Sequence, residues 1–533
     1  MAHTLFFRRV VLALQAARRE HLKEQNLPEP VPHTVTDWSR RRFLKTSAVT
    51  GLAGVIGQNL AFPVQADPSK SALRVAIIGA GIAGLNAAYQ LKQAGVSATV
   101  YEARSRVGGR MLSTRLDDGL VIDLGAELIN TDHTDMLALV KEFNIGLFNK
   151  LKDAALSPYP KEAYWFDGVS YSEAQLVDDL RPIAAQISDD SRRLYQDWEA
   201  NAPLFDQWSV SDYLNQHADK FAAAPYIRAL LESAIRTEYG AEPDESSALQ
   251  LLFILPEVNG QSVELLSYSD EAYAVRGGSA QITDAVANAL PGQIHMNKAL
   301  LAVESQGAEY RLKFADKTEE IADIVIITLP FPALRHVILN VPLPELFRDF
   351  IKEAGLGANE KVIASFTERF WHQPNGFSLA AWSDLGFAEV WDETQRQPER
   401  DDGALNFFLG GNQARQLNKI NNIKPLGELF VAQLDGFIPG AIDAATGTFL
   451  KSGWGQNRYT SGGYANFTPG QLTKFAEYFW IEAGKPFRQQ VGFGNLIFAG
   501  EHLSDAYYGF MEGGAQTGRL AATLALEKMT LLR

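Results

Sequence analysis

The chain has 533 residues, 46% of them hydrophobic and 21% charged, as expected for a soluble protein with a large core in two or more domains. Its 63 acidic side chains outnumber the 49 basic ones, and the net charge of -14 disfavours binding to nucleic acid. There are no cysteines and the nine histidines lack metal-ligand spacing, which excludes disulfides, thiolate metal sites and cysteine nucleophiles and predicts no metal.

Residues 1–66 have the features of an export leader. Residues 39–45, Ser-Arg-Arg-Arg-Phe-Leu-Lys, closely match the twin-arginine pattern, and a mildly apolar segment that contains glycine leads to a cleavage site at Ala66. We expect export through the twin-arginine machinery to the periplasm or the extracellular space. The alternative is a basic helix end beside an apolar helix. Cleavage after Ala66, retention as an anchor, and the role of residues 1–38 stay open.

A nucleotide-binding unit is predicted directly after this leader. Residues 75–84, Val-Ala-Ile-Ile-Gly-Ala-Gly-Ile-Ala-Gly, form an apolar strand that ends in G-x-G-x-x-G; a helical segment follows, and the next strand ends on Glu102. Gly79 permits the tight turn, Gly81 lets a pyrophosphate approach the backbone, and Gly84 lets helix and strand pack closely. Glu102 would accept hydrogen bonds from a ribose. Together these features predict a bound dinucleotide.

The next segment, residues 102–110, distinguishes between two dinucleotides. Its sequence, Glu-Ala-Arg-Ser-Arg-Val-Gly-Gly-Arg, resembles the extended motif of FAD enzymes of the glutathione-reductase type, in which an arginine after paired glycines meets the phosphates. The guanidinium of Arg110 suits phosphate oxygens because it can bind them in a bidentate manner. FAD is therefore a better candidate than NAD, with a solvated surface arginine as the alternative for Arg110.

The rest of the chain contains stretches with helical periodicity and stretches typical of short strands. Residues 120–127 are predicted to form a strand that leads into a glycine turn, and residues 131–250 are mostly helical in periodicity. A turn and helix after Val275 lead to three short apolar strands that should rejoin the nucleotide domain. The ranges of these three strands are 299–303, 310–314 and 324–328. Three further strands, 361–366, 376–382 and 404–409, are expected to form a sheet over the cofactor, and one last buried strand is expected at 495–501.

We therefore expect an α/β fold in which the cofactor and substrate regions are interleaved. The expected architecture is a Rossmann-like FAD-binding domain of the glutathione-reductase type and a mixed sheet-plus-helix substrate domain. The expected boundaries are 1–66 for the leader, 67–130, 271–330 and 454–533 for the FAD-binding domain, 131–270 for a helical insertion, and 331–453 for the substrate-binding domain.

From Leu73 to Thr530 the chain resembles the flavin-containing amine oxidase superfamily, which comprises monoamine, polyamine and L-amino-acid oxidases. Besides the first motif, the resemblance rests on residues 499–502, Ala-Gly-Glu-His, and 509–515, Gly-Phe-Met-Glu-Gly-Gly-Ala, whose family counterparts contact FAD. Residues 461–470 are closer to amino-acid oxidases than to animal monoamine oxidases, which bond a cysteine to the flavin. The resemblance implies noncovalent FAD.

The same resemblance implies roles for individual residues. Lys361, nine residues before Phe370-Trp371, matches the catalytic lysine that holds a water against flavin N5; the alternative is an exposed strand lysine. The implied substrate cavity contains Glu127, Trp454, Gly463 and Phe510, with core packing as the alternative for Trp454 and Phe510. The implied cofactor-binding residues are Gly79, Gly81, Ile82, Ala83, Gly84, Glu102, Ala103, Arg104, Gly109, Arg110, Ala126, Glu127, Leu300, Gly500, Glu501, Gly509, Phe510 and Met511.

One position departs from the family pattern. Where amino-acid oxidases of the snake type carry an arginine that clamps the substrate carboxylate, this chain has Glu127 and Leu128. A carboxylate at Glu127 is suited to attract a cationic amine. The alternative is a loop acid that accepts hydrogen bonds from backbone amides.

The expected activity is FAD-dependent oxidation of an amine or L-amino acid to an imine, which hydrolyses to a carbonyl compound and ammonia while O2 is reduced to H2O2. The expected partners are a small amine or amino acid, O2 and the export machinery, with a homodimer as an open option. Alternatives are an amine dehydrogenase that passes electrons to a quinone, a carotenoid-type or porphyrin-type FAD oxidoreductase, and a non-catalytic exported flavoprotein.

Overall fold

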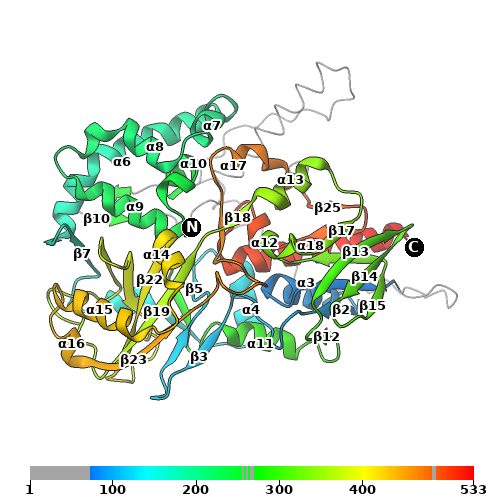
Figure 1. Cartoon of the computed structure of the whole chain (residues 1–533), viewed down its shortest axis with the longest axis horizontal. Coiled ribbons are helices and arrows are strands. Elements are labelled where there is room, and N and C mark those ends of the chain that lie inside the picture. Colours follow the sequence, from blue (N-terminus) through cyan, green and yellow to red (C-terminus); the bar gives the residue numbers. More distant parts are fainter. Residues whose placement is uncertain (1–72, 255–256, 260–261, 265–268, 483–487, 533) are drawn as a thin grey trace, which may run out of the picture. The chain divides into compact units, whose positions relative to one another are not determined.

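The computed structural model describes residues 73–254, 257–259, 262–264, 269–482 and 488–532 (Figure 1). The twin-arginine segment lies outside the described residues. From Arg74 onward the described chain belongs to one unit, although it contains several sheets. None of the helices in these ranges has the length and hydropathy that a membrane span requires.

A six-stranded sheet carries the predicted nucleotide motif. Its central strands pair in parallel and are almost wholly buried, which explains their uninterrupted apolar sequences. The strands, in spatial order, are β12 (Ile294–His295), β2 (Ala98–Tyr101), β1 (Val75–Ile78), β16 (Ile324–Ile327), β26 (Leu496–Phe498) and β25 (Gly492–Phe493). Three distant parts of the sequence thus meet in one sheet.

Two of the strands expected in the nucleotide domain belong to a second sheet rather than to the six-stranded one. Strands β13 (Leu300–Gln306) and β14 (Glu309–Phe314) pair with each other as an antiparallel hairpin. The four-stranded sheet that contains them has the order β15 (Glu319–Ala322), β14, β13 and β17 (Ile338–Asn340). Alternating burial along β14 shows why: only one of its faces is covered, unlike the parallel strands.

Two helices from opposite ends of the described chain lie side by side next to the six-stranded sheet (Figure 1). Helix α3 (Ile82–Gln93) follows β1, and α18 (Met511–Leu532) is the last element of the described chain. A Cβ atom at Gly518 of α18 would lie 2.2 Å from the Ala83 carbonyl oxygen, so only glycine allows this approach. The side chain of Asn86 also donates a hydrogen bond to the Ala515 carbonyl at 2.7 Å.

A seven-stranded sheet forms the second large layer. Its order is β23 (Ala445–Lys451), β19 (Asn359–Phe366), β22 (Gly403–Gly410), β21 (Glu389–Asp392), β20 (Ala380–Ser383), β7 (Glu162–Phe166) and β8 (Val169–Tyr171). One face packs into an apolar core together with residues of α14 (Gly411–Leu417), α15 (Lys424–Asp435) and α16 (Ala441–Ala444). The three strands predicted for a covering sheet are all in it.

The opposite face of this sheet is polar although it is mostly buried. Cross-strand neighbours lie on the same face, and the register places Lys361, Phe408, Glu389, Trp382 and Tyr164 in one row across five strands. Buried polar side chains on one face of a sheet indicate that this face serves a site rather than the core.

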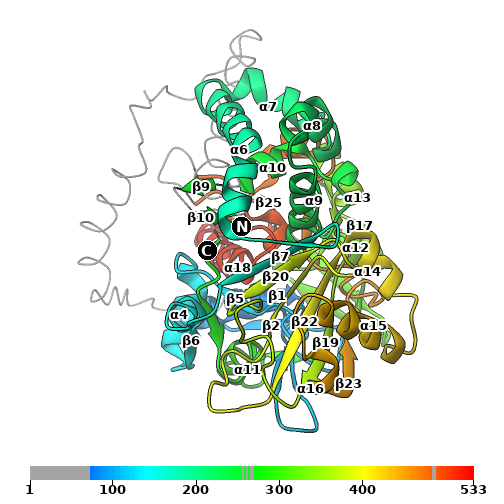
Figure 2. The same cartoon turned by 90° about the vertical axis from the view of Figure 1, so that its left-hand side faces the viewer.

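The segment predicted to be a helical insertion is mainly helical. Its helices are α6 (Glu173–Gln196), α7 (Trp198–Asp206), α8 (Val210–Gln216), α9 (Tyr226–Tyr239) and α10 (Ala248–Ile254), which group together in Figure 2. The same segment also supplies β7 and β8 to the seven-stranded sheet, which periodicity did not predict. The end of α9 reaches the polar face, because Asn359 Nδ2 donates to the Thr237 carbonyl at 3.1 Å.

The remaining elements are short and connect these layers. Two-stranded and three-stranded sheets are β3 (Ser113–Arg115) with β4 (Val121–Asp123), β5 (Leu128–Ile129) with β11 (Tyr273–Val275) and β6 (Leu147–Asn149), β9 (Glu257–Asn259) with β10 (Ser262–Glu264), and β18 (Gly355–Leu356) with β24 (Ala465–Asn466). The remaining helices are α4 (Thr134–Glu142), α5 (Lys150–Ala154), α11 (Ala280–Asn288), α12 (Phe331–Leu334), α13 (Glu345–Glu353) and α17 (Gln471–Lys474).

Candidate active site

The turn between β1 and α3 has the geometry of a pyrophosphate cradle. Gly79 has φ of +105°, and a Cβ atom at Gly84 would lie only 2.0 Å from the Gly79 carbonyl oxygen. Gly81 precedes the first turn of α3, whose backbone N–H groups donate no hydrogen bond to a capping side chain. An anion such as a phosphate is the natural partner of these N–H groups.

Glu102 lies at the end of β2 beside this turn. Its carboxylate accepts hydrogen bonds from the backbone N–H of Ala80 at 2.8 Å and of Arg104 at 2.9 Å. The acid is thereby fixed next to the glycine turn, where a ribose would lie. Ala103 follows Glu102 in sequence. The backbone N–H of Lys298 donates to the Glu102 carbonyl at 2.7 Å, which brings the segment before Leu300, another predicted cofactor contact, next to Glu102.

Arg110 is part of the site and is not a solvated surface arginine. Its Nη1 atom lies 2.7 Å from Glu501 Oε1 and 2.6 Å from the Gly463 carbonyl oxygen. The other oxygen of Glu501 accepts the backbone N–H of Gly509 at 2.6 Å. Four predicted site residues from four separate segments are thus brought together at the start of α18, which begins at Met511.

These residues fit an FAD molecule. A Cβ atom at Gly81 would have only Gly109 Cα near it, at 3.9 Å, so the turn is open there, and the positively charged Arg110 lies beside Glu501. His502 supplies an independent indication, because both of its ring nitrogens are buried and lack a hydrogen-bond partner among the described residues. Burial lowers the pKa of His502 to about 4, so the ring is neutral and offers one donor and one acceptor beside the Glu501 carboxylate.

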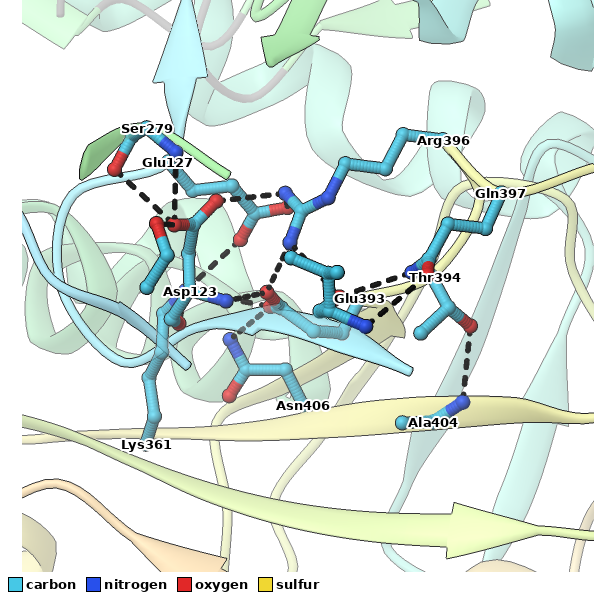
Figure 3. A network of polar contacts seen from close by, with 12 residues as sticks. Asp123, Glu127, Ser279, Lys361, Glu393, Thr394, Arg396, Gln397, Ala404 and Asn406 are labelled. Carbon is cyan, nitrogen blue, oxygen red and sulfur yellow. Dashed lines mark hydrogen bonds and ion pairs between the residues drawn. The ribbon is translucent and has the colours of Figure 1, made fainter. Parts of the chain in front are cut away.

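Lys361, the predicted catalytic residue, projects from β19 into a buried polar network (Figure 3). Its Nζ atom donates to the Asp123 carbonyl at 2.8 Å, to Glu127 Oε2 at 2.8 Å and to Glu393 Oε2 at 3.3 Å. Only 5% of the lysine is exposed, so the alternative of an exposed strand lysine is wrong. Trp391 Nε1 donates to the same Glu127 oxygen at 3.2 Å.

Glu393 and Arg396 complete this network, and the sequence analysis did not identify either. Arg396 Nη1 lies 2.7 Å from Asp123 Oδ2 and 3.6 Å from Glu127 Oε1, while its Nη2 lies 3.1 Å from Glu393 Oε1 (Figure 3). A signal was present: Glu389, Trp391 and Glu393 alternate along a single strand and its end, which places polar side chains on one face.

The network holds three acids and two bases, whose charges influence one another strongly. Burial alone would raise the pKa of Glu127, but the positive charges of Lys361, Lys150 and Arg396 hold it well below its usual range. Burial opposes the charge of Lys361, but Glu127, Glu393 and Asp123 raise its pKa, so it remains an ammonium. Burial and the charge of Glu127 raise the pKa of Glu393 to about 8. Glu127 is thus ion-paired rather than a loop acid bonded only to amides.

Trp454 lies beside this network, whereas Phe510 lies next to the Glu501-bound Gly509. Trp454 Nε1 donates to the Leu124 carbonyl at 2.8 Å, which fixes the indole against the chain between Asp123 and Glu127. Phe510 follows the Glu501-bound Gly509, and its ring centroid lies 4.8 Å from that of His133. Both side chains are buried, so their roles in a substrate cavity stay predictions.

Four further carboxylates gather beyond Lys361 on the polar side of the seven-stranded sheet; we call Glu162, Glu238, Glu271 and Glu389 the acidic group. Burial, then Glu271 and Glu162, raise the pKa of Glu389 well above its usual value. Burial raises the pKa of both Glu162 and Glu238 to about 7. Tyr464 connects the group to the cofactor end, because after burial its pKa is raised by Glu238, Glu271, Glu389 and Glu501.

Comparisons with known proteins agree with this geometry. A family model described as "Flavin containing amine oxidoreductase" matches residues 82–526. "Amine oxidase [flavin-containing] B" of Sus scrofa is 25% identical over 464 residues, which cover 85% of this chain and 86% of the relative. "Amine oxidase [flavin-containing]" of Oncorhynchus mykiss is also 25% identical, over 466 residues with the same coverage.

Two solved structures share the fold. Cyclohexylamine oxidase from Brevibacterium oxydans IH-35A has a TM-score of 0.72 at 22% identity, covering 86% of this chain and all of its own. Putrescine oxidase, solved with putrescine bound, has a TM-score of 0.69 at 21% identity, covering 85% and 99%. The similarity therefore extends over nearly the entire described chain.

Proposed function

We propose, since the chain belongs to the flavin-containing amine oxidoreductase family, that the protein is an exported oxidase for small amines that carry a second positive charge. Family membership makes it an FAD-dependent enzyme that oxidatively deaminates amines. Three features go beyond that activity: diamines or polyamines as substrates, O2 as the electron acceptor with H2O2 as product, and secretion by the twin-arginine route.

The chain provides positions for the cofactor and the substrate amine. FAD, when bound by the glycine turn, Glu102, Arg110 and Glu501, supplies the two-electron oxidation of the carbon–nitrogen bond. Lys361 of the seven-stranded sheet and Glu127 of the segment between β4 and β5 form a charge-balanced pair, which keeps strong polar groups in a buried site without a net charge. Tyr464 and Phe510 would orient the amine by packing against its apolar chain.

The acidic group is the observation that carries the substrate class. Glu238 is buried and the other three acids are half-buried; burial, to which neighbouring acids add, raises the pKa of each of these carboxylates. They are not arranged to chelate a metal, since no metal-binding group of acids or histidines occurs in the described ranges. A second ammonium group in the substrate would relieve the repulsion. The chain is similar in fold to putrescine oxidase, whose structure was solved with putrescine bound, and this supports a diamine as the substrate.

Lys150 favours one second candidate, an amino acid. This lysine is 7% exposed, and none of the described acids lies within ion-pair distance of its ammonium, although it affects the pKa values of Glu127, Glu271 and Glu389. This chain has Leu128 where amino-acid oxidases place the arginine that clamps the substrate carboxylate. Lys150 is a buried cation available to bind such a carboxylate. Four carboxylates against one ammonium make the dicationic amine the first choice.

The deciding experiment is peroxide release by the purified, FAD-loaded protein with a panel of diamines, polyamines, monoamines and L-amino acids. Peroxide with diamines and polyamines, at a kcat/KM at least about tenfold above that for monoamines of equal length, would support the proposed class. Peroxide only with amino acids, lost on Lys150→Met, would replace it with the second candidate. Reduction of FAD by a diamine without oxygen consumption would identify a dehydrogenase.

A further inference from the structure

The ammonium group of Lys361 has no hydrogen atom left for a water molecule. An ammonium donates three hydrogen bonds, and Lys361 directs them at the Asp123 carbonyl, Glu127 and Glu393. The first two are 2.8 Å long, whereas the bond to Glu393 is 3.3 Å long and is therefore the weakest. Any water or substrate atom that binds Lys361 must replace one of these acceptors, and Glu393 is the one most easily displaced.

Glu393 is itself held from several sides. Its Oε1 atom accepts the Asp123 backbone N–H at 2.6 Å and Arg396 Nη2 at 3.1 Å, while Oε2 faces Lys361 and Asn406 Nδ2 at 3.5 Å. The carboxylate is wholly buried, at 1% exposure. The hydrogen bond between Glu393 and Lys361 can therefore break without moving the carboxylate, because the Asp123 N–H and Arg396 keep it fixed.

We propose that Glu393 is a positioning residue that competes for the third N–H of Lys361, and that Arg396 fixes Glu393 for this role. The inference rests on the proposed oxidase function only in assigning Lys361 to the flavin site. When Glu393 is neutral it is a weak acceptor, and Lys361 can release it to bind water or substrate. When Glu393 is ionised it is a strong acceptor, and Lys361 stays tethered.

The pH at which this exchange occurs follows from the surrounding charges. Burial and Glu127 raise the pKa of Glu393 to about 8, against the opposing charges of Lys361 and Arg396. The other charged groups that face the network are Asp123, which raises the pKa of Glu393, and Lys150, which acts on Glu127. Lys361 and Arg396 stay charged and Glu127 stays ionised near neutral pH, whereas Glu393 titrates there.

The test compares the pH dependence of flavin reoxidation and of the FAD midpoint potential in the wild type and Glu393→Gln. Glutamine has the shape of neutral glutamic acid and does not ionise. In the wild type, reoxidation by O2 should slow several-fold between pH 7 and 9, and the plot of potential against pH should bend near pH 8. Glu393→Gln should keep the rate seen at low pH throughout and should show no bend.

The proposal would be overturned if Glu393→Gln showed the same fall in reoxidation rate and the same bend in the potential as the wild type. It would also be overturned if neither protein showed them. The matched control is Glu428→Gln, an exposed acid on α15 paired with Lys424, which should behave as the wild type does. If Glu393→Gln fails to retain FAD, Glu393→Asp decides, since it keeps a titrating carboxylate and must keep a pH-dependent fall. The potential is measured without substrate, so a failure of the amine panel leaves this result unaffected.

Discussion

Arg110 and Glu501, separated by 391 positions in the sequence, form an ion pair of 2.7 Å at the point where the first and last parts of the FAD-binding region meet. The arginine also donates to the Gly463 carbonyl, and the glutamate accepts from Gly509. This pair therefore joins the nucleotide turn to the segment that precedes α18. Its removal should affect the cofactor before it affects the fold.

We expect Glu501→Gln to weaken FAD binding about tenfold, or roughly 1.4 kcal/mol, because the partly buried Arg110 loses its ionic partner. FAD affinity can be measured by fluorescence titration of the deflavinated protein. Glu309→Gln, which removes an exposed partner of Arg74, is the matched control and should leave the affinity unchanged. Equal FAD affinity in Glu501→Gln and the wild type would remove the pair from cofactor binding.

Lys361→Met should leave FAD bound and slow flavin reoxidation or turnover at least about tenfold, since methionine fills a similar volume but provides no ammonium. Rapid-mixing absorbance of the flavin separates reduction by the amine from reoxidation by O2. Lys352→Met, at an exposed lysine of α13, controls for the loss of a positive charge. Unchanged rates in Lys361→Met would exclude this lysine from the mechanism.

Glu389→Gln should raise the KM for a diamine about tenfold and leave the KM for a monoamine of equal length within about twofold. The reason is that only the diamine has a second ammonium group for the acidic group to bind. Steady-state peroxide release measures both constants, and Glu304→Gln, an acid of β13 paired with Lys313, serves as control. An equal loss for both amines would make Glu389 a structural residue.

The acidic group also predicts how stability depends on pH. Glu162 and Glu238 have pKa values raised to about 7 by burial, so between about pH 4.5 and 7 the folded protein binds more protons than the unfolded chain. Their contribution to the free energy of unfolding therefore falls as pH rises through this window. We expect a lower melting temperature at pH 8 than at pH 6 without substrate. Under anaerobic conditions a diamine should raise it more at pH 8, where the carboxylates are ionised. The opposite order would contradict burial of these acids.

Gly518→Ala should separate α18 from α3, because the new Cβ atom would lie 2.2 Å from the Ala83 carbonyl oxygen. Overpacking of this kind costs about 1–3 kcal/mol, and part of the loss should appear as weaker FAD binding because α3 carries the phosphate-binding turn. Thermal unfolding with and without FAD measures both effects. Gly355→Ala, at a site with open space around the glycine, should change neither.

The nucleotide-binding half was predictable because its information is local. The apolar run of β1, the glycine turn and Glu102 occur within 28 consecutive residues, from Val75 to Glu102, and each needs only its neighbours to be interpreted. Lys361 was found through the family resemblance, on its spacing of nine residues before Phe370-Trp371. The pairing of β13 with β14 in a separate sheet was not predictable, because strand patterns do not specify their partners.

Glu393 and Arg396 were missed by the sequence analysis, although Glu389, Trp391 and Glu393 alternate along one strand and its end. Residues 393–400, Glu-Thr-Gln-Arg-Gln-Pro-Glu-Arg, have the composition of an exposed loop, yet Glu393 and Arg396 are buried. Their burial depends on ion pairs with Asp123 and Lys361, and Asp123 is 270 positions from Glu393. Charged residues appear solvent-exposed until the fold supplies partners of opposite charge.

The contact between α3 and α18 sets an order of events during synthesis. The turn that would hold the FAD phosphates lies near the start of the described chain, but the helix packed against it is the last element of the described chain and is synthesised much later. A nascent chain can form β1, α3 and β2 early, whereas Glu501, Gly509 and α18 follow only after the other described elements have been made. Retention of FAD therefore reports that synthesis has passed α18, and a chain shortened before Met511 should emerge colourless.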